Sequence, residues 1–473
     1  MLKNVDSKRV LDFFREISKI PRCSGNEKEI SDYLRNFALE LDLEVIQDEL
    51  LNIVIKKPGS IGYEKSPTVV LQGHMDMVCE KGTNSKHDFS KDPIELIEKE
   101  GFITGNDTTL GADDGIAVAM GMAILESDNI PHPPLELLIT VREETDMSGA
   151  LGLSSEILDG DMMINIDSEE EGILTVGSAG GVTVYATHMI EKEECDWNAY
   201  NVKFDGLKGG HSGMEIDKNR GNMIKVMNEF LSILSNKTKI KVGKFTSGSL
   251  DNAIPRSGEI NLCVENNDRE IFEFAKKELI SKFKDVDGKI TIEVDEINDK
   301  EVWSETIFSD ITKMISEIPT GVFSFVNGSN LVESSNNLAL IKEKDEEIYL
   351  EISIRSSDVA KEKEIVDKCI QILDENNFES KLDSSYPSWE YKAVSPLRDL
   401  AQKIYKKMYK EEIETLVVHA GLECGAISSQ YPNMDIISIG PNITGAHTPK
   451  EKMDLKSVER VYEYVLELLK EIK

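Results

Sequence analysis

The sequence predicts an α/β protein in which a domain with a mixed, largely parallel sheet is interrupted by an inserted α+β domain. Three observations support this fold class. The chain has 473 residues, which is too many for one hydrophobic core. Buried strands alternate with helices near both ends of the sequence. Between about residues 187 and 383 the strands instead alternate polar and apolar residues, as half-exposed strands do.

The elements of the first domain follow from apolar spacing. Two helices, separated by a break at 21–26, carry apolar residues at helical spacing, and two short strands follow around 43–47 and 52–56. A helix rich in small residues is predicted at 116–125, and an amphipathic helix closes the chain. Buried apolar runs predict four further strands, at 68–72, 135–141, 162–166 and 434–440.

The middle of the chain predicts a domain of two similar halves. From about 199 to 294 the order is strand, helix, two β segments, helix and strand. From about 305 to 383 it is helix, two β segments, helix and strand. The predicted domains are therefore 1–186 with 384–473, and an inserted domain at 187–383.

The composition is that of an acidic globular protein. The 87 acidic residues outnumber the 54 basic ones, and the net charge of −33 argues against nucleic acid or an anionic membrane as partner. The start of the chain has no apolar signal core, and no apolar run approaches a membrane span, so we expect a cytoplasmic protein. The six cysteines are widely spaced and form no C-x-x-C motif, so we expect reduced thiols.

Polar side chains follow the predicted strands. His74 and Asp76 come after the strand at 68–72 and lie on one face of it, since side chains alternate along a strand. An imidazole beside a carboxylate suits a metal ligand and the group that orients it. Glu143, Glu144 and Asp167 follow two other strands.

Two more candidates lie in loops: Asp113 in the Gly- and Asp-rich stretch 105–115, and His447 after the strand at 434–440. The carboxyl ends of parallel strands meet at one edge of a sheet, where such folds bind ligands. Two histidines and several carboxylates suit Zn²⁺, with Mn²⁺ or Co²⁺ as substitutes. If two ions bind about 3.5–4 Å apart, one carboxylate must bridge them. Of two adjacent glutamates, one can bind metal while the other acts as general base on water.

Each of these residues also has a plain structural interpretation. The Glu143–Glu144 pair could be a solvated turn in so acidic a chain. Asp113 and Asp167 could cap helices or form turns, and His447 could be an ordinary loop residue. Six such coincidences at one edge of a sheet are much less frequent than any single one, which favours the metal site.

Further candidates lie elsewhere in the sequence. His211, in a glycine-rich turn, could donate to a developing oxyanion or simply occupy a tight turn. Arg355 could bind a substrate carboxylate or form a surface ion pair. His419 and Glu423 belong to a segment that is either a buried junction or a wall of the substrate pocket. Cys424 hints at a thiol nucleophile, but the metal-binding pattern is the stronger signal.

The combined motifs resemble the di-zinc peptidases of the aminoacylase and carboxypeptidase clan, and within it the subfamily of bacterial aminoacyl-histidine dipeptidases. The likeness spans essentially the whole chain. It rests on the motifs Gly73–Asp76, Gly111–Gly115, Glu143–Glu144, Ile166–Ser168, Gly209–Gly213, His419–Gly425 and His447. This chain departs from the family at Arg142, where relatives often have Thr or Asp, and at Asp114, where they often have Asn. Neither departure removes a ligand, but both could alter pKa values or metal preference.

The resemblance implies a role for each residue. The metal ligands would be His74 and Asp167 for one zinc ion, Glu144 and His447 for the other, and Asp113 as the bridge. Asp76 would orient His74, and Glu143 would be the general base. The peptide bond after the bridging residue is typically cis in this family.

The resemblance also implies a zinc-peptidase-like fold and an activity. The expected reaction is metal-dependent hydrolysis of dipeptides, Xaa-His such as β-Ala-His and broader ones, with two Zn²⁺ per chain. The inserted domain would be a lid that also mediates homodimerisation, and His211 could act in its own subunit or in the partner subunit. The alternatives are an N-acyl amino acid deacylase and a catalytically silent metal-binding protein on the same fold.

Overall fold

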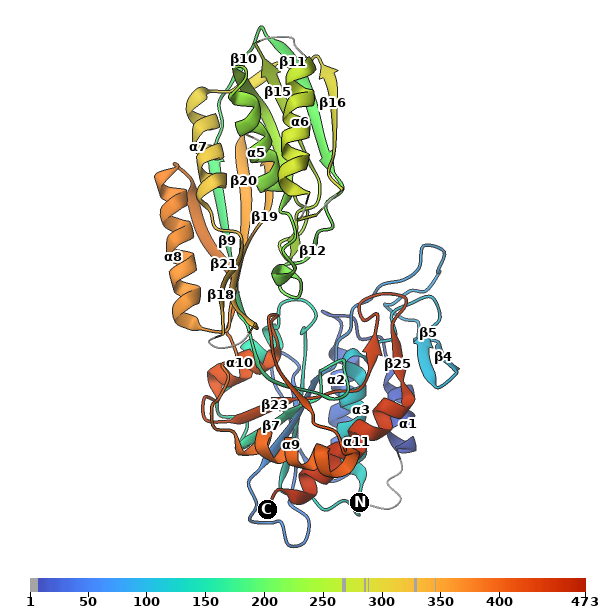
Figure 1. The fold of residues 1–473 in the computed structure, drawn as a ribbon. Coiled ribbons are helices and arrows are strands. Elements are labelled where there is room, and N and C mark those ends of the chain that lie inside the picture. Colours follow the sequence, from blue (N-terminus) through green and yellow to red (C-terminus); the bar gives the residue numbers. More distant parts are fainter. Residues whose placement is uncertain (1–6, 266–268, 285, 288, 327–329, 345) are drawn as a thin grey trace. The chain divides into compact units, whose positions relative to one another are not determined.

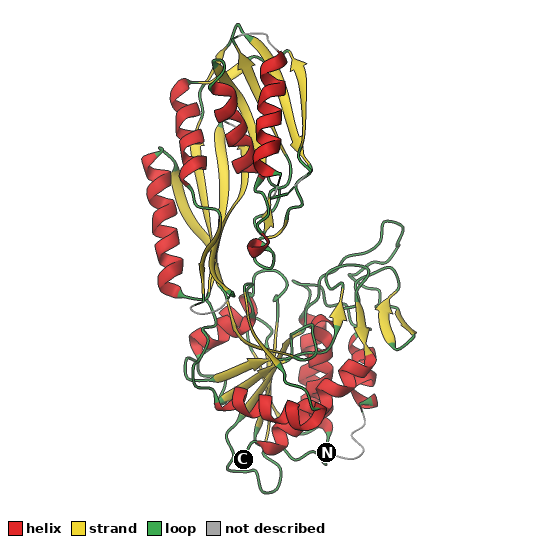
Figure 2. Cartoon of the chain, viewed as in Figure 1, coloured by secondary structure: helices red, strands yellow, loops and turns green. Residues whose placement is uncertain are grey.

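The computed structural model describes residues 7–265, 269–284, 286–287, 289–326, 330–344 and 346–473. The chain forms two compact units (Figure 1, Figure 2). Unit 1 comprises Met1–Ser178, Trp389–Val417 and Leu422–Lys473, and unit 2 comprises Ala179–Ser388 and Val418–Gly421. The chain thus leaves unit 1 before the predicted boundary at 186 and re-enters it after the predicted boundary at 384. It also returns to unit 2 once more, which the sequence did not indicate.

Unit 1 is built around an eight-stranded sheet. In spatial order the strands are β1 (Glu44–Gln47), β2 (Ile53–Lys57), β6 (Leu135–Thr140), β3 (Val69–His74), β7 (Met162–Asn165), β23 (Asp435–Ser438), β8 (Ile173–Ser178) and β22 (Glu414–Val418). The central pairings β6–β3, β3–β7 and β7–β23 are parallel. The flanking pairings β1–β2, β2–β6 and β23–β8 are antiparallel. The predicted α/β class with a mixed, largely parallel sheet is confirmed.

The sheet of unit 1 has a hydrophobic core on each face, because its central strands are apolar along their whole length. Val69 and Leu71 of β3 pack into one core, and Val70, which points the other way, packs into the second. The helices of the first core are α1 (Lys8–Ile17), α2 (Lys28–Glu40), α3 (Ala112–Glu126), α9 (Pro396–Tyr409) and α11 (Leu455–Glu471). Those of the second are α4 (Ser148–Leu151) and α10 (Glu423–Gln430).

The small residues of α3 allow it to lie directly against the sheet. The helix is buried from Ala112 to Leu125, and a Cβ atom at Gly121 would lie 2.4 Å from Cδ1 of Leu137 in β6. The helix begins earlier than predicted, but Asp113 and Asp114 have non-helical φ and ψ angles. The peptide bond between them is cis, as the resemblance implied.

A second, four-stranded sheet in unit 1 was not predicted. It consists of β24 (Ile443–Thr444), β25 (Lys452–Asp454), β5 (Phe102–Gly105) and β4 (Leu96–Lys99). Strands this short contain too few residues for a periodic pattern.

Unit 2 contains a nine-stranded sheet made of two similar halves. The first half is β11 (Asn198–Asp205), α5 (Met223–Ser235), β13 (Ile240–Ser247), β15 (Gly258–Val264), α6 (Arg269–Phe283) and β16 (Thr291–Ile297). The second half is β9 (Gly180–Met189), α7 (Glu305–Glu317), β19 (Val332–Lys344), β20 (Glu347–Ser356), α8 (Val359–Glu375) and β21 (Glu379–Tyr386). In the sheet, the strands of the two halves lie in the orders β16-β11-β15-β13 and β21-β9-β20-β19. Numbered along the chain within each half, both orders read fourth, first, third, second.

The two halves join through β13 and β19, and β18 (Gly321–Phe325) pairs with β19. Helices α5 to α8 share one hydrophobic core with the sheet (Figure 1). Two short ribbons complete the unit: β10 (Lys192–Glu194) with β17 (Glu301–Trp303), and β12 (Gly210–His211) with β14 (Ala253–Ile254). None of the helices in the described part of the chain is both long and apolar enough to cross a membrane.

Cys23 and Cys79 form a disulfide, so the expectation that all six cysteines are reduced is wrong for this pair. Their Cα atoms lie 5.7 Å apart although 56 residues separate them in the sequence. Cys23 pairs with Met77 in a β-bridge beyond the end of β3, and this tertiary contact brings the two thiols together. The other four cysteines are free and buried.

Removing this disulfide is expected to destabilise unit 1. Closing a loop of 56 residues restricts the unfolded chain, so a Cys23→Ser, Cys79→Ser double variant should lose about 2–4 kcal/mol of the free energy of unfolding. Urea titrations with and without dithiothreitol measure the loss. The reductant should lower the stability of the wild type toward that of the variant and leave the variant unchanged. Equal stability of the two proteins without reductant would contradict the prediction.

Candidate metal centre

The carboxyl ends of three parallel strands bring predicted metal ligands together. His74 ends β3, Glu143 and Glu144 follow β6, and Asp167 follows β7. β3 pairs with β6 on one side and with β7 on the other, so the three strand ends are neighbours. Nε2 of His74 lies 3.4 Å from Oδ1 of Asp167.

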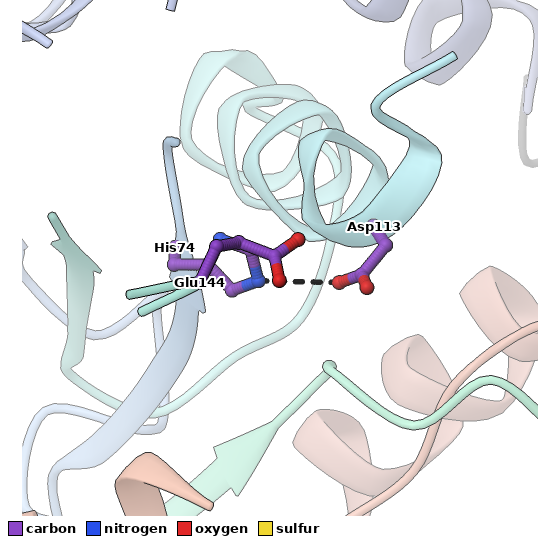
Figure 3. A group of neighbouring side chains, drawn as sticks. All are labelled: His74, Asp113 and Glu144. Carbon is purple, nitrogen blue, oxygen red and sulfur yellow. Dashed lines mark hydrogen bonds and ion pairs between the residues drawn. The ribbon is translucent and has the colours of Figure 1, made fainter. Parts of the chain in front are cut away.

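Asp113 lies between the two histidines. Its Oδ1 is 3.2 Å from Nε2 of His74, and its Oδ2 is 3.1 Å from Nε2 of His447. His447, in the loop between β24 and β25, also lies 2.8 Å from Oε2 of Glu144. Figure 3 shows that His74, Asp113 and Glu144 point toward one another. One carboxylate thus offers an oxygen to each histidine, which is the arrangement that a ligand bridging two ions requires.

These side chains fit divalent metal ions. In the described part of the chain, His74, Asp113 and Glu144 offer ligand atoms that all lie within 4.8 Å of one another, and so do His74, Asp114 and Asp167. Oε1 of Glu144 is buried and has no hydrogen-bond partner among the described residues. Such an orphaned oxygen costs free energy, which a bound cation would offset. Imidazole nitrogen and carboxylate oxygen are ligands that Zn²⁺ accepts.

Burial and neighbouring charges shift the pKa values of the side chains at this site. Burial raises the pKa of Asp167 to about 6. Burial also raises the pKa of Glu143 well above its usual value, and the charges of Asp167 and Glu144 add to the shift. Hydrogen bonds to Asp113 and Glu144 raise the pKa of His447 to about 11. Burial is the main cause for the two carboxyl groups, and neighbouring carboxylates are the main cause for His447; divalent cations would offset the concentrated negative charge.

Asp76 connects three parts of the site. Its buried carboxylate lies 3.4 Å from Nδ1 of His74 and accepts the hydroxyl proton of Ser24 at 2.7 Å. It also accepts hydrogen bonds from the backbone N–H groups of Glu143 and Glu144, at 3.1 and 3.3 Å. These contacts fit the predicted orienting role and add a second one, because the same carboxylate holds the backbone of both glutamates. Ser24, in the loop between α1 and α2, was not predicted.

The two adjacent glutamates have different surroundings. Oε2 of Glu144 faces His447, whereas Oε2 of Glu143 lies 3.9 Å from Nε2 of His74. No side chain in the described residues donates a hydrogen bond to the carboxylate of Glu143. The carboxylate of Glu143 is therefore not occupied by another side chain, as a general base requires.

A network of buried polar side chains was not predicted. It includes one residue on each of β3, β6 and β7, shortly before the proposed metal ligands in the sequence. Oε2 of Glu423 accepts hydrogen bonds from Nε2 of Gln72 at 2.7 Å and from Oγ1 of Thr140 at 2.6 Å. Nδ2 of Asn165 donates to Oε1 of Gln72 at 2.5 Å. Burial raises the pKa of Glu423 to about 8. Both partners of Oε2 lie on strands of the sheet, as a buried junction requires, whereas Oε1 is buried without a hydrogen-bond partner among the described residues. The contact of Glu423 with substrate stays a prediction.

In unit 2, His211 is oriented by its own turn. The backbone N–H groups of Gly213 and Met214 donate to Nδ1 of His211, at 3.0 and 3.2 Å. Since Nδ1 accepts, the proton of the neutral ring lies on Nε2, which is then a hydrogen-bond donor. Burial and the charge of Arg355 lower the pKa of His211, which favours the neutral form of the ring.

Arg355 and His419 are neighbours of His211 in unit 2. Arg355 is buried, donates to the hydroxyl of Tyr386 at 2.5 Å and forms no ion pair with a described residue, which argues against a surface ion pair. Nε2 of His419 lies 2.7 Å from Oγ of Ser335. Nε of Arg355 and Nδ1 of His419 are buried without a hydrogen-bond partner in the described residues. Burial, with the charge of Arg355, lowers the pKa of His419 to about 3.

Comparison with known proteins shows which family the chain resembles. Residues 70–471 match Peptidase family M20/M25/M40. The chain is 33% identical to the cytosol non-specific dipeptidase of Escherichia coli (strain K12), over 100% of this chain and 99% of the relative. The crystal structure of aminoacylhistidine dipeptidase from Vibrio alginolyticus superposes with a TM-score of 0.90 at 32% identity, covering 100% of this chain and 98% of that one.

A more distant structure shares the fold. The M20 family metallo-carboxypeptidase of Sulfolobus solfataricus gives a TM-score of 0.56 at 14% identity, over 98% of both chains. The family match covers most of the sequence, and the two nearly full-length likenesses exceed 30% identity. The chain therefore belongs to peptidase family M20/M25/M40.

Proposed function

We propose that this protein is a metal-dependent dipeptidase that hydrolyses aminoacyl-histidine and other dipeptides. The observation that carries the proposal is Asp113, whose two carboxylate oxygens lie 3.2 and 3.1 Å from His74 and His447. The names of the two full-length relatives, both dipeptidases, support the substrate class.

The ligands divide into two sets that share Asp113. His74 and Asp167 would hold one ion, and His447 and Glu144 the other. Zn²⁺ is the proposed metal, with Mn²⁺ or Co²⁺ as substitutes. Bound ions would polarise the scissile carbonyl and acidify water.

The protein groups supply proton transfer and orientation. Glu143 accepts the proton of the attacking water and returns it to the leaving amine. Asp76 keeps His74 in position through Nδ1. Nε2–H of His211 is the proposed donor to the oxyanion, supplied by its own chain or by a second one. Arg355, with its unpaired Nε, is proposed to bind the free carboxylate of the dipeptide. Dimerisation through unit 2 and a cytoplasmic location are part of this proposal.

A substrate panel tests the proposed function. Protein reconstituted with Zn²⁺ or with Mn²⁺ is incubated with Ala-Ala, β-Ala-His, a tripeptide and an N-acetyl amino acid. We expect hydrolysis of the two dipeptides and little or none of the other compounds. Preferential cleavage of the N-acetyl amino acid would identify a deacylase instead. No turnover of any compound by protein that contains metal would identify a binding protein.

A further inference from the structure

Glu451 holds the backbone that carries Asp113. Its side chain is buried, and its two carboxylate oxygens accept four backbone N–H groups in succession. Oε2 accepts from Leu110 at 2.7 Å and Gly111 at 3.0 Å, and Oε1 accepts from Ala112 at 2.8 Å and Asp113 at 3.4 Å. A single side chain, more than three hundred residues away in the sequence, thus satisfies the N–H groups at the start of α3.

The start of α3 needs such a partner. The first N–H groups of a helix have no acceptor within the helix, and a neighbouring Ser, Thr, Asp or Asn usually supplies one. Here the N-cap position is Gly111, with φ of 68°, which has no side chain to do so. A carboxylate is also favoured at this end by the helix dipole. The opposite side of the same turn is held by Arg22, whose guanidinium donates to the carbonyl oxygens of Gly111 and Met75.

The same residue belongs to the loop of the second histidine. Glu451 follows His447 by four positions, and its backbone N–H donates to the carbonyl of Thr448 at 3.0 Å. His447 has a φ of 61°, a backbone conformation that side-chain-bearing residues adopt only when surrounding contacts hold it. Glu451 therefore joins two loops, one carrying Asp113 and the other carrying His447.

We propose that Glu451 is a positioning residue that sets the separation of Asp113 and His447, and thereby stabilises the ion held by Asp113, His447 and Glu144. This inference rests on the proposed metal-dependent function. The other ion should depend on Glu451 less, because it shares only Asp113 with the first, and its own ligands lie at the central sheet: His74 ends β3 and Asp167 follows β7. Loss of the carboxylate is therefore expected to weaken one of two metal-binding events selectively.

Calorimetric titration of metal-depleted protein with Zn²⁺ tests this inference without measuring activity. Glu451→Gln keeps the shape of the side chain but replaces one acceptor oxygen with an NH₂ group. Some of the four backbone N–H groups would then face a donor instead of an acceptor. We expect one of two binding constants to fall about tenfold or more, the range seen when groups that orient metal ligands are removed, and the other to stay nearly constant. Glu451→Asp retains both oxygens and should recover part of the loss.

Glu136→Gln is the matched control. Glu136 is also buried in unit 1 and accepts the backbone N–H groups of Asp159 and Gly160, but it lies in β6 four residues before Thr140, at the strand end that carries no ligand. This variant should bind both ions as the wild type does. If Glu451→Gln fails to fold, selective weakening in Glu451→Asp supports the inference.

Two results would overturn the inference. The first is that Glu451→Gln binds both ions with wild-type affinity. The second is that Glu451→Gln weakens both ions to the same extent and that Glu136→Gln does the same. A failure of the proposed function looks different. Wild-type protein that binds two ions and cleaves no dipeptide refutes the function and leaves the positioning role intact, whereas wild-type protein that binds no ion refutes both.

Discussion

Glu143→Gln is expected to lower kcat by about 10²–10⁴-fold while both metal ions stay bound. The amide keeps the size of the side chain but cannot accept the proton of the attacking water. Metal binding should persist because Oε2 of Glu143 lies 3.9 Å from Nε2 of His74 and Glu143 belongs to neither of the proposed ligand pairs. Steady-state kinetics and elemental analysis of the same preparation measure the two effects.

The neighbouring residue provides the control for this experiment. Glu144→Gln makes the same chemical change one position further along, where the carboxylate faces His447 at 2.8 Å. This variant should lose metal as well as activity. Near-normal turnover in Glu143→Gln, or metal loss in Glu143→Gln rather than in Glu144→Gln, would show that the two roles have been assigned wrongly.

Asp113→Asn is expected to reduce metal content from about two ions per chain to one or fewer, and to abolish dipeptide hydrolysis. An amide offers one acceptor oxygen and one NH₂ group, so it cannot bridge two ions as the carboxylate of Asp113 can. The same change removes the acceptor of one of the two histidines. Elemental analysis after gel filtration measures the metal, and the substrate panel measures the activity.

Asp114→Asn is the matched variant for the bridging role. Asp114 is buried next to Asp113, and it too forms a group of possible ligands with His74 and Asp167. We expect Asp114→Asn to retain two ions, with at most a change in metal preference. If Asp114→Asn loses an ion and Asp113→Asn keeps both, the bridge is Asp114 and the proposed assignment is wrong.

Much of the candidate metal centre could be predicted because several of its proposed ligands lie at or just after the ends of apolar strands. A continuous apolar run identifies a buried strand, and parallel strands place their carboxyl ends at one edge of the sheet. His74, Glu144 and Asp167 could therefore be predicted to meet without knowledge of the strand order. The buried polar network next to these residues could not be predicted. Gln72 and Thr140 are single polar positions in apolar runs, and only the packed structure shows that both donate to Glu423.

The sequence by itself determined the α/β class, the apolar strands and the set of chemical groups at their ends, because periodicity and residue type are local properties. Only the tertiary structure decided which distant segments meet. It placed β9 in the second half of unit 2 although this strand precedes the first half, and it joined Cys23 to Cys79. It also set the carboxylate of Glu451 against four backbone N–H groups before and at Asp113. These contacts depend on the topology of the fold. No periodic pattern in the sequence indicates which residues, hundreds of positions apart, will form hydrogen bonds with each other.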